Sequence, residues 1–169
     1  YRDSWKKGTG MYLYIRQKLF SIGDRYSVFN QAEEPVYMVE GEIFTLGAKI
    51  HLYDLAGNEL FYIQQRLFRF LPQYELYKGD VLCAVISKKI SFFSHRLEIE
   101  SSYGDFYVDG DAFGMDFSIG VDDRTIGGIS KKWFTFGDSY ELFIENDQDA
   151  AFFCALVIAI DNCMHNGEE

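Results

Sequence analysis

The sequence is poor in proline and in cysteine. It contains two prolines and three cysteines, Cys83, Cys154 and Cys163. Scarce proline together with 18% aromatic residues argues against a disordered chain and suits a protein of many β-strands. Because an odd number of cysteines does not form a complete set of disulfides, we expect a reducing, cytosolic setting in which the thiols act as small apolar side chains.

Positive charge is also scarce, with 16 Lys and Arg against 26 Asp and Glu and a net charge of −10. Since the backbone of DNA and RNA is anionic, this balance disfavours generic binding to nucleic acid. Residues 1–10 lack the apolar core of a signal peptide, and we expect them to form a flexible leader. Residues 11–166 suit a single domain, followed by a tail at 167–169.

Motifs that mark enzymes and metal sites are missing as well. The chain has no nucleophile elbow, phosphate-binding loop or zinc-protease helix signature. His51, His95 and His165 share no metal-ligand spacing with the cysteines. We therefore expect no enzyme activity, no cofactor and no metal. An active site assembled from residues far apart in the sequence is the remote alternative, because it leaves no such motif.

The longest apolar run covers residues 150–160, AAFFCALVIAI, and is the feature around which the chain is organised. As a helix, these eleven residues span about 16 Å, roughly half of a bilayer's hydrocarbon core. Apolar side chains face all directions, so the rest of the protein must surround the helix. We expect Asn146 or Asp147 as its N-cap, Cys154 to be inert, and Cys163, beyond the run, to react faster with thiol reagents.

A hairpin-sized repeat precedes this run. Residues 14–28 (YIRQKLFSIGDRYSV), 62–76 (YIQQRLFRFLPQYEL) and 128–142 (GISKKWFTFGDSYEL) are similar, and three weaker copies lie between them. Equivalent positions in the six copies are 21 to 24 residues apart, and they are Lys18, Glu42, Arg66, Lys89, Asp111 and Lys132. A period of this length is too short for strand–helix–strand units and fits hairpins.

Six hairpins predict twelve strands joined as an antiparallel meander. We expect strands near residues 11–17, 26–30, 36–41, 49–54, 59–66, 73–77, 80–87, 95–100, 105–109, 116–121, 124–131 and 139–145. A closed sheet of twelve strands is roughly 24 Å across, which leaves about 10 Å between its wall and the axis of a central helix. The predicted fold is therefore mainly β, a closed twelve-stranded antiparallel barrel around a hydrophobic C-terminal α-helix.

Three segments also resemble a known family. They are YIRQKLFSIGDRYSV at 14–28, KKWFTFGDSYELFI at 131–144 and AFFCALVIAID at 151–161. In this order they are similar to the LURP-one-related family of the tubby-like superfamily, over nearly the whole chain. The resemblance implies a twelve-stranded barrel around a central helix, and no known catalytic residues. Phosphoinositide-binding tubby domains and phospholipid scramblases belong to the same superfamily, but their lipid-contacting and membrane-anchoring features have no matching motif here.

Alternate loops of a meander meet at one end of the barrel, and half of the sixteen basic residues fall at that predicted end, mixed with acids. The other end is predicted to be acidic and to receive the helix N-terminus, as the helix dipole favours. The candidate ligand-binding residues of the basic rim are Lys18, Arg66, Lys88, Lys89, Lys131 and Lys132. Such a rim suits phospholipid headgroups or another anion, whereas the structural alternative is that these charges only keep strand ends soluble.

The sequence thus favours a non-enzymatic module that binds an anionic ligand or membrane phospholipid headgroups. The alternative is a protein-interaction or scaffold domain that uses Trp133, Phe134 and Phe136 beside the rim. We expect a cytoplasmic protein without a transmembrane segment, attached peripherally to the inner membrane face when it binds lipid.

Overall fold

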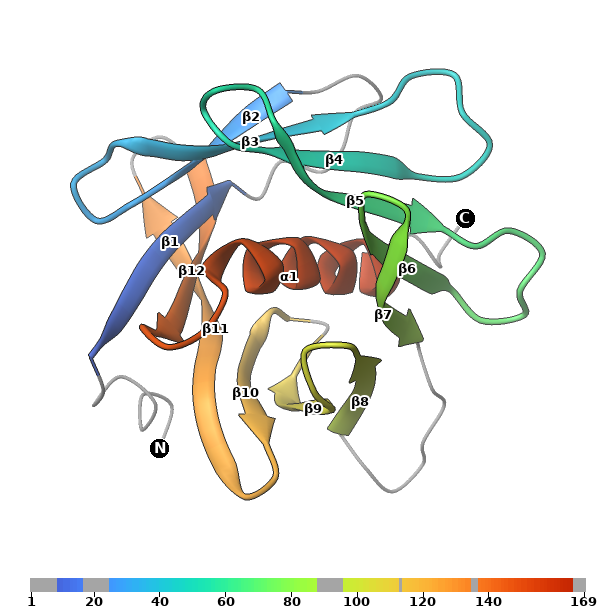
Figure 1. Ribbon diagram of the computed structural model, residues 1–169. Helices are drawn as coiled ribbons and strands as arrows, with labels where there is room; N and C mark the ends of the chain where they lie inside the picture. Colours follow the sequence, from blue (N-terminus) through green and yellow to red (C-terminus); the bar gives the residue numbers. More distant parts are fainter. Residues whose placement is uncertain (1–8, 17–24, 88–95, 113, 135–136, 166–169) are drawn as a thin grey trace.

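The fold is a closed barrel with a helix through its centre, seen in a computed structural model that describes residues 9–16, 25–87, 96–112, 114–134 and 137–165 (Figure 1). Every strand is antiparallel to its neighbours, and β1 pairs with β12 to close the sheet. The strands are β1 (Gly10–Arg16), β2 (Arg25–Phe29), β3 (Pro35–Gly41), β4 (Lys49–Tyr53), β5 (Glu59–Gln65), β6 (Gln73–Lys78), β7 (Val81–Ser87), β8 (Arg96–Ser101), β9 (Phe106–Asp111), β10 (Asp116–Val121), β11 (Arg124–Phe134) and β12 (Gly137–Glu145).

These elements confirm the predicted fold class and the predicted hairpin meander. Period-two alternation explains the strands: in β4, Ile50 and Leu52 are buried in the barrel, while His51 between them lies on the outer face. One hairpin is longer than predicted, because Trp133 pairs with Asp138 and Phe134 with Gly137. The predicted strand near residues 124–131 therefore ends too early, and Lys132 lies within β11 together with Lys131.

Helix α1 (Ala150–His165) fills the barrel, as Figure 1 shows. Every residue from Phe152 to Ile160 is buried, so the helix has no face toward water, as predicted. Within the described part of the chain, no helix is long and apolar enough to span a membrane. Near the N-terminus of α1, the Phe152 ring stacks on Tyr103 at 4.2 Å between centroids and packs against Phe61 and Phe106.

Two expectations about the helix ends are wrong. The N-cap is Asp149, whose Oδ1 accepts a hydrogen bond from the Phe152 backbone N–H at 3.1 Å, because α1 begins at Ala150 and not earlier. Cys163 is fully buried, because the helix continues beyond the apolar run and carries Cys163 under residues 66–72. There, its Sγ donates to the backbone oxygen of Pro72 at 3.5 Å.

Among the residues that the structure describes, four strand pairs carry a register shift, and all four shifts lie toward the barrel end where α1 begins. A β-bulge bends a strand and increases its twist, so these shifts help the sheet to close around the helix N-terminus. They occur at Val28/Phe29, Leu52/Tyr53, Leu76/Tyr77 and Ile119/Gly120. Gly120 also leaves room for the Tyr107 ring, which a Cβ at this position would overlap.

Candidate functional site

The predicted basic rim is only partly within the described residues. Lys18, Lys88, Lys89 and Phe136 lie outside them, and Trp133 and Phe134 are described only as backbone in β11. Of the six candidate cations, the structure describes Arg66, Lys131 and Lys132.

Two of these cations are held by buried glutamates of the neighbouring strand. Arg66 Nε lies 3.1 Å from Glu75 Oε1, and Lys132 Nζ lies 3.5 Å from Glu141 Oε1. The hydroxyl of Tyr77 also donates to Glu75, at 2.7 Å. In both hairpins the glutamate follows the cation by nine positions. The cations at these equivalent positions of the repeat, Arg66 and Lys132, therefore have a structural role in addition to any binding role. Binding of an external anion by these cations stays a prediction.

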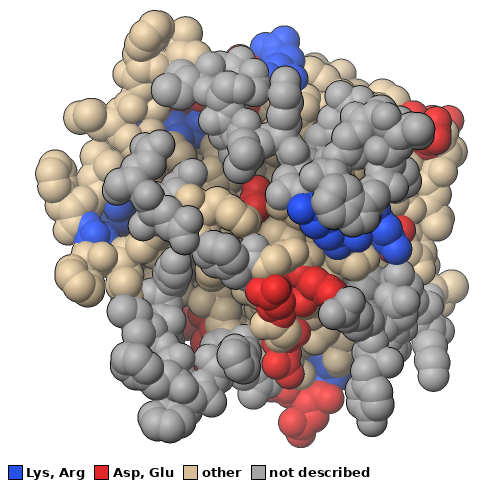
Figure 2. Space-filling view, turned by 180° about the vertical axis from the view of Figure 1, so that it is seen from behind, with Lys and Arg blue, Asp and Glu red and all other residues tan. Residues whose placement is uncertain are grey.

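Charges of both signs lie side by side on the molecular surface. In Figure 2, among the described residues, basic side chains form small separate groups, and the largest of these groups has acidic side chains close to it. Arg25 Nη2 contacts Glu40 at 2.6 Å, and Arg124 Nη2 contacts Glu145 at 3.0 Å. Over the described surface, attraction of anions therefore depends on short stretches where a cation lies beside uncharged side chains.

One such stretch comprises residues 42–48 and 66–72, which we call the apical loops. They join β3 to β4 and β5 to β6, and both project from the side of the barrel where α1 ends (Figure 1). Their large apolar side chains face water, with exposed fractions of 52% for Ile43, 95% for Phe44, 83% for Leu46, 40% for Leu67, 101% for Phe68 and 97% for Phe70. The half-exposed Arg66 and the exposed Arg69 flank the second group.

Hydrogen bonds join the last residue of the first apical loop to the end of β5, where the second apical loop begins. The Gln65 backbone N–H donates to Ala48 O at 2.8 Å, and the Ala48 N–H donates to Gln65 Oε1 at 2.9 Å. Gly47 has a φ of +78°, and a Cβ there would lie 2.8 Å from Leu67 Cδ2. The positive φ therefore favours glycine at this position, because a residue with a Cβ would be strained there.

The two aromatic tips have unusual backbone conformations. Phe44 has a φ of 57° and Phe68 a φ of 59°, in the left-handed region that non-glycine residues rarely adopt. Such a conformation costs roughly 1–2 kcal/mol in a non-glycine residue. Neither ring gains compensating burial, since both are almost entirely in solvent. Strain and exposed apolar surface at one place are typical of functional sites.

Reasoning from the sequence missed the apical loops, although a signal was present. In nearly every copy of the repeat, aromatic or aliphatic residues occur two and four positions after the equivalent position. Examples are Phe44 and Leu46 after Glu42, and Phe68 and Phe70 after Arg66. The pattern does not predict exposure by itself, because Met115, at the equivalent place in another copy, is fully buried.

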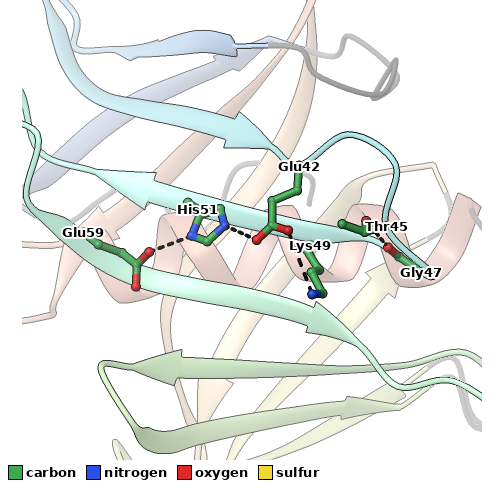
Figure 3. Close-up of polar contacts among 6 residues, drawn as sticks. All are labelled: Glu42, Thr45, Gly47, Lys49, His51 and Glu59. Carbon is green, nitrogen blue, oxygen red and sulfur yellow. Dashed lines mark hydrogen bonds and ion pairs between the residues drawn. The ribbon is translucent and has the colours of Figure 1, made fainter.

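A histidine bridge lies at the base of the first apical loop (Figure 3). His51 Nε2 is 2.8 Å from Glu42 Oε1, and His51 Nδ1 is 2.6 Å from Glu59 Oε2. The imidazole stacks on the ring of Tyr62, with centroids 4.9 Å apart. Burial, followed by the charges of Glu42 and Glu59, raises the pKa of Tyr62, so its hydroxyl stays neutral.

The opposite end of the barrel carries smaller apolar features. Leu55 and Val81 are exposed there, and a shallow depression is lined by Lys78, Val81, Cys83, Ser102 and Tyr103. Among the described residues, no group of three or more His, Cys, Asp or Glu side chains is arranged to hold a metal ion. The apical loops with the adjacent His51 bridge are therefore the candidate functional site.

Comparison with known proteins gives relatives along nearly the whole chain. A Bacillus subtilis (strain 168) protein described as uncharacterised protein YxjI is 31% identical over 157 residues, which are 93% of this chain and 96% of that protein. The X-ray structure of an Arabidopsis thaliana protein, AT5G01750, superposes with a TM-score of 0.67 at 15% identity and covers 91% of each chain, which shows a shared fold. The sequence model of the LURP-one-related family matches residues 11–161. The chain therefore belongs to the LURP-one-related family, as its sequence segments and its tubby-like barrel indicated.

Proposed function

We propose that this protein is a non-enzymatic module that attaches to anionic phospholipid membranes through its apical loops. The observation that carries the proposal is the group of fully exposed apolar side chains at the loop tips, above all Phe44, Phe68 and Phe70. Complete transfer of one such side chain out of water is worth about 1.5–3 kcal/mol. Three or four of them entering a membrane interface together supply enough free energy for peripheral attachment.

The shape of the site favours a bilayer over a protein partner. The exposed apolar side chains lie on two loops that project from the same side of the barrel, so they can enter the interface of a bilayer together. Arg69 lies on the second loop between Phe68 and Phe70, so its guanidinium group would meet headgroup phosphates while the two rings enter the apolar layer. The proposal retains the expected cytoplasmic location, at the inner membrane face.

Vesicle flotation tests the proposal. We expect wild-type protein to float with vesicles that contain phosphatidylglycerol and to float less with pure phosphatidylcholine vesicles. The double variant F44S/F68S should lose binding, and R69E should lose the preference for anionic lipid. The matched control is L55S, which removes an exposed leucine from the opposite barrel end and should bind as wild type does.

Wild-type protein that floats with neither vesicle at low salt would refute membrane binding. The apical loops would then be candidate contacts for a protein partner, together with Trp133, Phe134 and Phe136, and the scaffold alternative would replace the membrane proposal.

A further inference from the structure

The His51 bridge contains more hydrogen-bond acceptors than a neutral histidine can serve. Both ring nitrogens lie within 2.8 Å of a carboxylate oxygen, Nδ1 at Glu59 and Nε2 at Glu42 (Figure 3). An ionised carboxylate only accepts hydrogen bonds, and a neutral imidazole carries one N–H donor and one lone pair. Only the doubly protonated ring donates to both glutamates. The neutral ring leaves one lone pair facing a carboxylate at hydrogen-bond distance.

The groups around His51 come from four strands. Glu40 lies opposite His51 on β3, and Glu42 directly follows that strand. Glu59 and Tyr62 belong to β5. Lys49 and Tyr53 lie on β4, on either side of His51. Glu40 is paired with Arg25 of β2 at 2.6 Å. With Glu40 and Arg25 balanced, the local charge is that of Glu42, Glu59 and Lys49. It is net negative when His51 is neutral and close to zero when His51 is protonated.

Glu42 connects this bridge to the first apical loop. Its backbone N–H donates to Lys49 O at 2.9 Å and so closes the loop, while its carboxylate lies between His51 and Lys49 Nζ, the latter at 3.9 Å. Phe44 follows two positions later. A charge change at His51 therefore acts at the base of a loop that would touch the membrane.

We infer that protonation of His51 strengthens attachment of the apical loops to anionic membranes. This inference rests on the proposed membrane-binding function and adds its regulation. Protonation acts in two ways: it removes the net negative charge beside the docking surface, and it fixes Glu42 by a second charge-assisted hydrogen bond in the bridge. Binding should therefore weaken as the pH rises through the value at which the ring loses its second proton.

The test measures partition onto phosphatidylglycerol vesicles, whose phosphodiester charge is constant over the range, at about pH 5.5 and about pH 9. We expect wild-type protein to bind about fivefold more tightly at the lower pH, the effect of one elementary charge near an anionic surface. The variant H51Q, which keeps one donor and one acceptor but does not titrate, should bind equally at both values. The control H165Q should keep the wild-type pH dependence, because His165 contacts Asp161 of α1 and not the bridge.

A second readout does not need lipid. In nuclear magnetic resonance titrations, the ring nitrogens of His51 and the amides of residues 42–48 should shift with one common midpoint, and the amide shifts should vanish in H51Q. Pronounced pH dependence that persists in H51Q, or wild-type binding that is equal at both pH values, would overturn the inference and leave the proposed function intact. Absence of wild-type binding at both pH values would instead refute the proposed function, while the titration would still report whether His51 controls the loop.

Discussion

Phe44 and Phe68 occupy equivalent positions 24 residues apart and share both a left-handed backbone and an almost fully exposed ring. The repeat therefore extends beyond strand order to the conformation of single loop residues. Two aromatic side chains that bury nothing, held in a strained backbone, contribute nothing evident to folding. The shared exposure and strain therefore favour a functional role of Phe44 and Phe68 over a structural role.

Replacing both residues by glycine should leave stability unchanged or raise it. Glycine adopts a positive φ without the steric cost that Phe44 and Phe68 bear, and no packing is lost. Thermal unfolding of F44G/F68G measures this. As a contrast, L82G, which removes a half-exposed side chain from within β7, should lower stability by at least about 0.5–1 kcal/mol. A clear loss of stability in F44G/F68G would show that the rings have a structural role.

A charge in the middle of α1 should prevent folding. Leu156 is fully buried inside the barrel, and L156D places a carboxylate there without a partner, which costs several kcal/mol. Circular dichroism and size-exclusion chromatography should show an unfolded or aggregated protein. L156M, which nearly conserves volume, should fold and lose less than about 1.5 kcal/mol. A cooperatively folded L156D protein would contradict the burial of the helix.

The Arg66–Glu75 pair should matter more to stability than an exposed ion pair. In R66Q, the buried Glu75 carboxylate keeps the Tyr77 hydroxyl as a donor but loses its cation, and we expect a loss of about 1–3 kcal/mol. K49Q breaks the looser contact with Glu42 and should cost less than about 1 kcal/mol. Chemical denaturation compares the two variants, and equal small effects would argue against a structural role for the buried glutamate.

Both helix thiols should be inert in the native protein. Cys154 and Cys163 are fully buried, and burial raises the pKa of the Cys154 thiol, so neither access nor ionisation favours attack. Cys83 lines the shallow depression near Tyr103 and should react first with a thiol reagent. Mass spectrometry after brief labelling identifies the site. Faster labelling of Cys163 than of Cys83 would show that the end of α1 opens.

Asp161 should make the protein less stable as pH rises toward neutrality. Burial raises the pKa of this carboxyl, although His165 and the Tyr140 hydroxyl partly oppose the shift. A raised folded-state pKa gives stability that is present below the unfolded value of about 3.9 and is lost as pH rises through the folded value. The gain in melting temperature of D161N over wild type should therefore grow between about pH 4 and pH 7.

Asp54 provides a control of opposite sign. Hydrogen bonds from the side chain and backbone of Asn58 lower the pKa of Asp54, so its contribution is present above the unfolded value and is lost as pH falls through the folded value. D54N should therefore be less stable than wild type near neutrality, and the difference should shrink in acid. Identical pH profiles for D161N and D54N would contradict the assigned directions.

The fold was predictable because its signals are repetitive. Six similar hairpins and one apolar run define the strands and helix, and closure follows from the need to surround Ala150 to Ile160. The ends of elements were less predictable, since the N-cap at Asp149 depends on where the helix starts. The candidate site was hardest to predict, because exposure of Phe68 and pairing of Arg66 depend on loop geometry and on a neighbouring strand.

Pairing of β1 with β12 has a further consequence for how the protein folds. Leu13 pairs with Leu142, so closure joins residues 129 positions apart, whereas each hairpin forms from local contacts. Before this step, both edges of the sheet are open and its apolar concave side lacks α1. Unpaired strand edges can pair with another chain, so closure of the first strand against the last also protects the folded barrel from association through its edges.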